Sequence, residues 1–239
     1  MTELLALGAH PDDVELCCGG WLALAARRGQ GVRIVDLTAG ELATNGNPEL
    51  RAAEAAEAAE VLGVAGRENL GLPDGGLSPH DEAQVAAVVA VIRRHRPVVL
   101  LAPWAVARHP DHAAASALIT RAVFFAGLPK VSGGAPHRPL RVLAYPERHD
   151  APADLVVDVT EVAAIKAAAI ACHRSQLAGD PTVLTSGLGL GAFTVRDRYW
   201  GGSIGVEHGE PYVVGGPLPV SDPIAHFLAH PARPVWVPR

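Results

Sequence analysis

Two short apolar runs, each ending in a loop rich in His and Asp and passing at once into a helical pattern, constrain the fold of this chain most. The first run covers residues 4–8, the sequence His10-Pro11-Asp12-Asp13 follows it, and residues 14–28 are rich in Ala and Leu. This order indicates a buried strand, a polar loop and a helix. In open α/β sheets, ligands bind outside the carboxyl ends of the strands, where this loop would lie.

The residue types in this loop suit a metal ion. Imidazole nitrogen and carboxylate oxygen are ligands that Zn²⁺ accepts in a tetrahedral arrangement. A structural alternative is that Asp12 or Asp13 caps the following helix and that His10 is an ordinary loop histidine, since helix caps are common. The first loop alone leaves both interpretations open.

A second stretch repeats the layout about a hundred residues later. Residues 98–103 read as a buried strand, Arg108-His109-Pro110-Asp111-His112 follows, and residues 113–126 have helical spacing. Two such loops at the carboxyl ends of neighbouring strands can face each other across one crevice. Neither loop alone is strong evidence for a metal, but the pair predicts a shared metal site.

The alternation of strands and helices continues to about residue 176. Further strands are expected at residues 31–38, 68–70, 140–145 and 155–159, and further helices at 48–62, 81–94 and from Thr160 to about Gln176. This order predicts one α/β domain over residues 1–239, Rossmann-like, with a doubly wound and mainly parallel sheet. A dinucleotide site is not expected, because Gly19-Gly20 stands inside the first helix and the turn before it is acidic.

The pattern weakens in the last quarter of the chain. Residues 179–191 are rich in Gly and Pro and read as an irregular flap, and residues 193–199 read as a helical turn. Residues 210–239 are expected to form an irregular C-terminal extension, either a covering arm or an oligomer contact, and not a second domain.

Composition excludes several classes of partner and location. The net charge of -5 argues against a nucleic-acid partner or an anionic membrane. No apolar run approaches the roughly 18 residues that a membrane span needs, and no basic region precedes the first run as in a signal peptide. The three cysteines fit a reducing cytoplasm, and Cys17 and Cys18 are expected in the core of the first helix.

Three ligands from the two loops would leave one position for water, the pattern of a catalytic zinc site. Hydrolysis then needs a carboxylate that stays off the metal as general base and a His that faces the oxyanion. The loops hold enough residues for both roles. Arg51, on the helix at 48–62, is either an anion clamp at the pocket or a surface partner of Glu54.

Together these residues resemble the LmbE-like zinc N-deacetylases, relatives of the GlcNAc-phosphatidylinositol de-N-acetylase. The resemblance covers most of the chain and includes Asp36-Leu37-Thr38 with Gly40-Glu41, Arg51-x-x-Glu54-Ala55, Asn69-Leu70-Gly71-Leu72-Pro73-Asp74 and Ser175-Gln176. Within the family the chain looks most like the branch that deacetylates N-acetylglucosaminyl malate in bacillithiol biosynthesis. That likeness rests on Thr44-Asn45-Gly46, on residues 122–127 and on Tyr199-Trp200-Gly201.

The resemblance implies one Zn²⁺ per chain, or another divalent ion, bound by His10, Asp13 and His112. It implies that Asp12 is the general base for the attacking water. His109, with its ring held by Asp111, would polarise the acetyl carbonyl and protonate the departing amine.

The resemblance also implies residues for substrate binding. Arg51 and Arg108 are candidates for the malate carboxylates, and Asp74 is a candidate for a sugar hydroxyl. One feature departs from the family pattern. Some relatives place a Tyr in the late flap to assist the oxyanion, whereas residues 187–192 contain no Tyr.

The expected function is therefore that of a zinc-dependent hydrolase that removes the acetyl group from an N-acetylglucosamine conjugate. The expected substrate is N-acetyl-alpha-D-glucosaminyl L-malate. Two alternatives are a deacetylase of another N-acetyl sugar, such as a chito-oligosaccharide or a mycothiol-like amide, and a non-catalytic metal- or sugar-binding protein. A cytoplasmic homo-oligomer without a nucleic-acid or membrane partner is expected.

Overall fold

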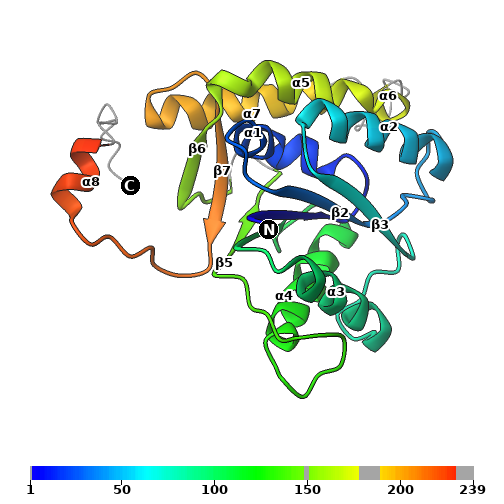
Figure 1. Ribbon diagram of the computed structural model, residues 1–239. Coiled ribbons are helices and arrows are strands. Elements are labelled where there is room, and N and C mark those ends of the chain that lie inside the picture. The colour runs from blue at the N-terminus through cyan, green and yellow to red at the C-terminus, as the bar shows by residue number, and fades with distance from the viewer. Residues whose placement is uncertain (1, 148–150, 178–188, 230–239) are drawn as a thin grey trace.

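The structure is a computed structural model that describes residues 2–147, 151–177 and 189–229. Its centre is a seven-stranded sheet in the order β3-β2-β1-β4-β5-β7-β6 (Figure 1). The strands are β1 (Leu4–Gly8), β2 (Val32–Thr38), β3 (Gly66–Leu72), β4 (Val99–Pro103), β5 (Arg141–Tyr145), β6 (Leu155–Asp158) and β7 (Gly209–Val214). Strands β1 to β5 pair in parallel, whereas β7 runs antiparallel to β5 and β6. The predicted α/β fold with a mainly parallel sheet is confirmed.

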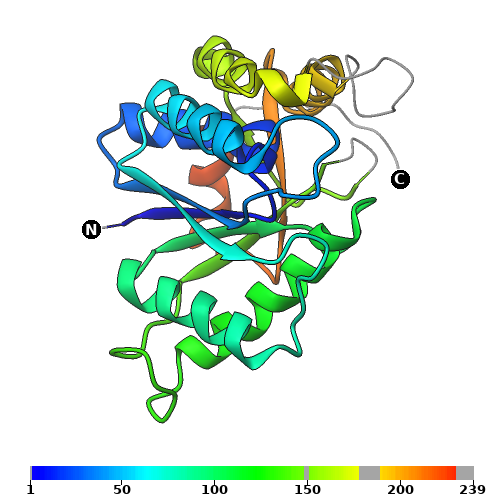
Figure 2. The ribbon, with the colours of Figure 1, turned by 90° about the vertical axis from the view of Figure 1, so that its right-hand side faces the viewer.

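Helices cover both faces of this sheet. They are α1 (Asp13–Arg27), α2 (Pro48–Leu62), α3 (Glu82–His95), α4 (Pro110–Ala126), α5 (Ala163–Cys172), α6 (Arg174–Leu177), α7 (Gly189–Ile204) and α8 (Pro223–Ala229), with a 3₁₀ turn, η1 (Thr160–Val162). Figure 2 shows α1, α2, α5 and α7 on one side of the sheet and α3 and α4 on the other. Within the described ranges, no helix has both the length and the apolar character that crossing a membrane requires.

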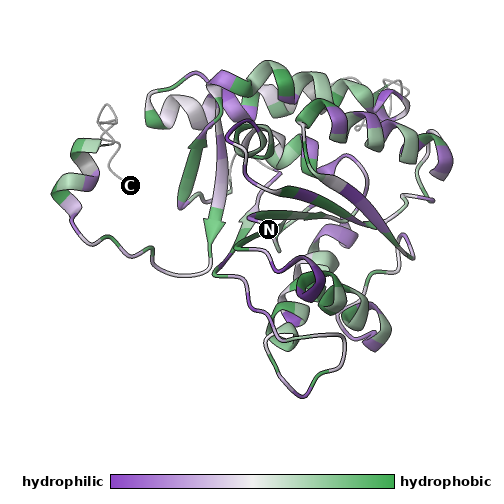
Figure 3. Ribbon diagram, viewed as in Figure 1, coloured by the Kyte–Doolittle hydropathy of each residue, from purple (hydrophilic) through white to green (hydrophobic). Residues whose placement is uncertain are grey.

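The core has two parts, because successive side chains of a strand point to opposite faces of a sheet. In β1, Leu4 and Ala6 belong to the cluster that includes α1, whereas Leu5 and Leu7 pack with α3 and α4. Cys17 and Cys18 are free thiols buried in the first cluster, as the sequence predicts. Figure 3 shows that β3, at the edge of the sheet, is largely hydrophilic, which agrees with its partial exposure.

The direction in which the chain crosses the sheet reverses between β1 and β4. From β1 the chain proceeds outward through β2 to β3, and it then returns to place β4 on the other side of β1. The loops that follow these two neighbouring strands therefore diverge, and open α/β sheets bind ligands in the crevice between such loops. The two His/Asp loops follow these strands.

Helix α4 begins three residues earlier than its apolar spacing predicts. Pro110 occupies the first helical position, where its missing N–H group would have no partner in any case. His109 caps the helix, because its Nδ1 accepts a hydrogen bond from the amide of Asp111 at 3.2 Å. Asp111 and His112 consequently lie on the first helical turn and not in a loop.

The C-terminal part differs more from the predicted pattern. Helix α7 covers 16 residues where the sequence predicts a single turn, and the expected helix from Thr160 is divided into η1, α5 and α6. Residues 209–214 form β7 within the sheet, so the first residues of the expected extension are part of the fold. Pro211 is tolerated there because the described pairing of β7 with β5 begins only at Val213. Most of the expected flap, residues 179–188, lies outside the described residues.

Candidate metal centre

The two His/Asp loops meet at the carboxyl ends of β1 and β4. His10 follows β1, Asp13 is the first residue of α1, and His112 lies on the first turn of α4. All three side chains are buried, and the centroids of the His10 and His112 rings are 5.3 Å apart. The predicted convergence of these residues is therefore present in the structure.

The donor atoms of these three residues have the spacing of metal ligands. Nδ1 of His10 lies 3.2 Å from Nε2 of His112, and that nitrogen lies 3.1 Å from Oδ1 of Asp13. The other oxygen of Asp13 lies 3.6 Å from Nδ1 of His10. Bonds of about 2.0–2.1 Å around a tetrahedral zinc ion place neighbouring donor atoms roughly 3.3 Å apart. The side chains present thus fit a zinc ion.

Other residues near this centre also carry donor atoms. Ring nitrogens of His10, His109 and His112 lie within 4.8 Å of one another, and so do donor atoms of His10, Asp74 and Asp111. His109 is exposed, and its ring centroid lies 4.7 Å from that of His10. The geometry therefore places His109 next to the proposed ligands, where a substrate can reach it.

His10 and His112 each direct one ring nitrogen toward the centre and the other toward a carboxylate. Nε2 of His10 lies 3.0 Å from Oδ1 of Asp74 and 3.4 Å from Oδ2 of Asp111. Nδ1 of His112 contacts Oε1 of Glu147, just beyond β5. Metal-binding histidines commonly donate their second N–H to a carboxylate, which fixes the ring and its tautomer. Asp74 and Glu147 hold the positions of such partners.

Sequence reasoning missed these two carboxylates as partners of the histidines. Asp74 is predicted to bind a sugar hydroxyl, but Oδ2 of its carboxylate accepts from the amide of Leu42 at 2.9 Å while Oδ1 faces His10. Glu147 belongs to none of the motifs found in the sequence. The signal that could have found it is its place two residues after a predicted parallel strand, at the edge of the sheet where the site lies.

Asp12 has an unusual backbone and an unusual carboxyl group. Its φ of 129° lies in the left-handed region, which non-glycine residues seldom adopt and which is found at functional sites. Burial and the neighbouring charge of Asp13 raise the pKa of the Asp12 carboxyl to about 6, although Arg51 opposes this change. A carboxyl group with this pKa can exchange a proton near neutral pH.

Arg51 holds the backbone of the first loop in place. Its guanidinium donates to the carbonyl of Pro11 at 2.6 Å and to that of Gly40 at 3.2 Å, and Nη2 lies 3.4 Å from Oδ1 of Asp12. Gly40 is required there, because a Cβ atom would lie 1.9 Å from Nη1 of Arg51. The alternative of a surface pair with Glu54 is wrong, since Glu54 is buried and accepts hydrogen bonds from Ser175.

Three further predicted residues lie at or near the centre. The carboxylate of Asp111 accepts from the amide of Gly75 at 2.7 Å and lies near His10, so its described contacts with His109 run through its backbone amide. Burial and the nearby rings of His10 and His112 lower the pKa of His109. Arg108 is exposed beside His109.

Comparisons with known proteins find similarity over the part of the chain that carries both loops. The family model described as "PIG-L: GlcNAc-PI de-N-acetylase" matches residues 5–123, which include both loops. The "Diacetylchitobiose deacetylase" of Thermococcus kodakarensis is 31% identical over 196 residues, covering 75% of this chain and 72% of the relative. The "Probable N-acetyl-alpha-D-glucosaminyl L-malate deacetylase 2" of Bacillus cereus is 28% identical, covering 73% of this chain and 83% of the relative.

A solved structure of similar fold covers nearly the whole chain. The "conserved protein TT1542" from Thermus thermophilus superposes with a TM-score of 0.83 and 42% sequence identity. The match covers 92% of this chain and 96% of that one. The likeness therefore extends beyond the two loops to the sheet and helices that position them.

Proposed function

The chain belongs to the PIG-L family, and from this premise we propose that it is a zinc-dependent hydrolase that removes the acetyl group from an N-acetylglucosamine conjugate. The observation that carries the proposal is the meeting of His10, Asp13 and His112, with donor atoms at the spacing of zinc ligands. The deacetylases among the relatives support the reaction class.

The proposed substrate is N-acetyl-alpha-D-glucosaminyl L-malate. The malate deacetylase among the relatives supports it, as does Arg108, an exposed residue next to His109 in the sequence whose guanidinium suits a carboxylate. Arg51 is a weaker candidate for the malate, because its guanidinium is already bonded to two backbone carbonyls. Diacetylchitobiose is the alternative substrate, supported by the Thermococcus relative.

His10, Asp13 and His112 are proposed to hold the zinc ion. When bound there, zinc supplies Lewis-acid polarisation of the acetyl carbonyl and lowers the pKa of water at the site. Asp74 keeps the imidazole of His10 turned toward the centre.

Asp12 is proposed to accept the proton of the attacking water. Its carboxylate adjoins Asp13, and Arg51 fixes the Pro11 carbonyl just before it, so the base is held next to the metal ligands. His109 is proposed to give a proton to the departing amine. A histidine of lowered pKa is a stronger acid once protonated, which favours this transfer.

The test is acetate release by the zinc-loaded protein from three compounds: the malate conjugate, diacetylchitobiose, and N-acetylglucosamine without an anionic group. We expect release from the malate conjugate with the highest kcat/KM. A higher kcat/KM for diacetylchitobiose would show that the proposed substrate is wrong and that the proposed reaction is right. Zinc binding without acetate release from any of the three would support the non-catalytic alternative and overturn the proposal.

We further propose that the protein acts in the cytoplasm as a homo-oligomer. All three cysteines are free and buried, which suits a reducing compartment. Ile224 and Leu228 of α8 are 72% and 76% exposed, and Figure 1 shows this helix apart from the body of the molecule. A subunit contact would bury these side chains.

A further inference from the structure

Glu147 is not one of the proposed metal ligands and takes no direct part in the proposed reaction. Its carboxylate contacts Nδ1 of His112, whose Nε2 faces His10 and Asp13. An acceptor at Nδ1 holds the proton on that nitrogen and leaves the lone pair of Nε2 directed at the metal. The side chain of Glu147 is 23% exposed, so its position depends on how its backbone is held.

Two hydrogen bonds fix the chain immediately before Glu147. Before it, the hydroxyl of Tyr145 donates to the carbonyl of Leu7 in β1 at 2.7 Å. The carbonyl of Pro146, immediately before Glu147, accepts from Nη1 of Arg196 at 2.9 Å. Arg196 comes from α7, about fifty residues later in the chain, and is 1% exposed.

Arg196 also binds the helix that begins with Asp13. Its Nη2 donates to the carbonyls of Leu16 and Cys17 in α1, at 3.2 Å and 2.9 Å. The amides one turn later, of Gly20 and Trp21, donate to the carboxylate of Glu210 from β7 at 2.7 Å and 2.8 Å. Two charged side chains from the C-terminal part thus hold one turn of α1.

The charges of Arg196 and Glu210 are balanced inside the protein. Arg196 donates to Asp197, and Nζ of Lys166 lies 2.6 Å from Asp197 and 2.7 Å from Glu210. All four side chains are buried. A buried charge is tolerated when it is paired and hydrogen-bonded. Moving Arg196 or Glu210 away from α1 would leave a buried charge without its partners, so both side chains resist displacement.

We propose that Glu147 is the positioning residue of His112, and that Arg196 keeps it in place by fixing the Pro146 carbonyl to α1. Through this link the C-terminal helix α7 sets the zinc affinity of a centre built by the first half of the chain. The inference rests on the proposed function only in taking His112 as a zinc ligand.

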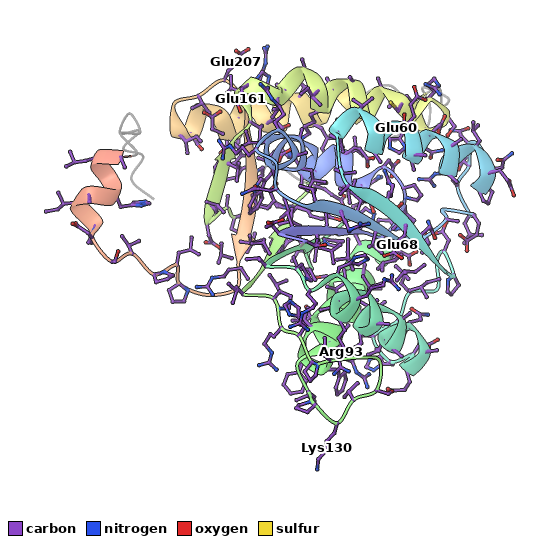
Figure 4. All side chains as sticks on the ribbon, viewed as in Figure 1. Glu60, Glu68, Arg93, Lys130, Glu161 and Glu207 are labelled. Carbon is purple, nitrogen blue, oxygen red and sulfur yellow. The ribbon has the colours of Figure 1, made fainter. Side chains whose placement is uncertain are left out.

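The first test is zinc affinity, measured by competition with a chromophoric chelator and without substrate. We expect Glu147→Ala to weaken zinc binding by about 10- to 100-fold, the usual loss when a carboxylate partner of a metal-binding His is removed. Glu147→Gln should recover most of this loss, because its amide oxygen still accepts from Nδ1. Glu161→Ala is the control, since Figure 4 shows Glu161 at the outer rim near α5. Glu147→Ala binding zinc within twofold of wild type would overturn the proposal.

The second test separates the link from general stability. Arg196→Lys keeps the charge but cannot reach the carbonyls of Pro146, Leu16 and Cys17 together. Arg198→Lys is the matched control, because Arg198 lies on the same helix and is 63% exposed. We expect weaker zinc binding in Arg196→Lys and unchanged binding in Arg198→Lys. In the double variant Arg196→Lys/Glu147→Ala, the loss of zinc affinity in log units should be smaller than the sum of the losses in the two single variants.

Two outcomes of the second test would refute the link. Fully additive losses would show that Arg196 does not act through Glu147, and unchanged zinc affinity in a folded Arg196→Lys would show that it does not act on the centre. Because zinc binding is measured without substrate, these failures are distinct from a failure of the wild-type protein to release acetate.

Discussion

At the scale of single residues, the site depends on the division of work among neighbouring carboxylates. Asp12 and Asp13 are adjacent, yet Asp13 faces both histidines whereas Asp12 faces Arg51. Burial raises the pKa of Asp12, while the two histidines outweigh burial and hold the pKa of Asp13 well below its usual range. Neighbouring acidic groups whose pKa values are shifted in opposite directions are typical of sites that carry out acid–base chemistry.

This division predicts opposite defects in two variants. Asp12→Asn should bind zinc as wild type does and lose about 10²–10⁴-fold in kcat, the usual contribution of a general base. His112→Ala should lose zinc at micromolar chelator and lose activity for that reason. Zinc content and steady-state kinetics measured on both variants check this. Near wild-type kcat in Asp12→Asn would show that another group takes the proton.

Arg51 gives a second prediction at this scale. Because its guanidinium holds the carbonyls of Pro11 and Gly40, Arg51→Lys should misplace Asp12 and lower kcat by about 10- to 100-fold while KM changes little. Arg108→Ala is the comparison, since it should raise KM for the malate conjugate and leave a neutral N-acetyl sugar unaffected. A rise in KM confined to the malate conjugate in Arg51→Lys would restore its interpretation as an anion clamp.

At the scale of elements, a second buried cluster joins α1 to strands β2 and β3. Arg67 of β3 contacts Glu15 of α1 and donates to both carboxylate oxygens of Asp36 in β2, and His173 lies 3.2 Å from Glu15. Against the cost of burial, the charges of Arg67 and His173 lower the pKa of Glu15 to about 2. Glu15 therefore stabilises the native fold as a carboxylate.

This pKa predicts how stability depends on pH. A depressed native pKa adds stability that is present above the unfolded value of about 4.5 and is lost as the pH falls toward 2. In the metal-free protein, Glu15→Gln should lower the free energy of unfolding by about 3 kcal/mol at pH 7, and by much less at pH 3. Glu60→Gln, on the exposed face of α2, is the control for loss of an acidic side chain. An equal deficit at both pH values would contradict the assignment.

The sequence predicts these elements unequally, for physical reasons. Strands β1 and β4 are uninterrupted apolar runs, and α2 is bounded by the Asn47 cap and by Gly63 at φ 71°, so local signals suffice there. Helix α7 and β7 contain Gly, Pro and charged residues whose burial depends on partners far along the chain. Arg196 and Glu210 read as ordinary surface charges until the fold places them against α1.

At the scale of the whole molecule, local sequence again fails to predict the contacts of the site that join distant parts of the chain. The two loops and their convergence follow from local patterns and from the rule that places ligands at the carboxyl ends of strands. The contacts of Glu147 and Asp74 do not, because they depend on the register of β5 and on the path of the loop after β3. Local sequence therefore indicates the proposed metal ligands but not the residues that orient them.

The apolar face of α8 gives a prediction about assembly. If a second copy covers Ile224 and Leu228, the mass in solution, measured by light scattering, should be at least twice the 24.8 kDa of one chain. Leu228→Asp should lower that mass, whereas Val195→Asp, at a similarly exposed apolar residue of α7, should not. A wild-type protein of 24.8 kDa would contradict the proposed homo-oligomer.

The proposed reaction requires one ion, shared by the loops after β1 and β4. The most direct test is to titrate metal-free protein with zinc and to follow acetate release from N-acetyl-alpha-D-glucosaminyl L-malate. We expect no release without metal, a rise in proportion to added zinc, and a break at one zinc ion per chain. Full activity without metal, or none at saturating zinc, would contradict it.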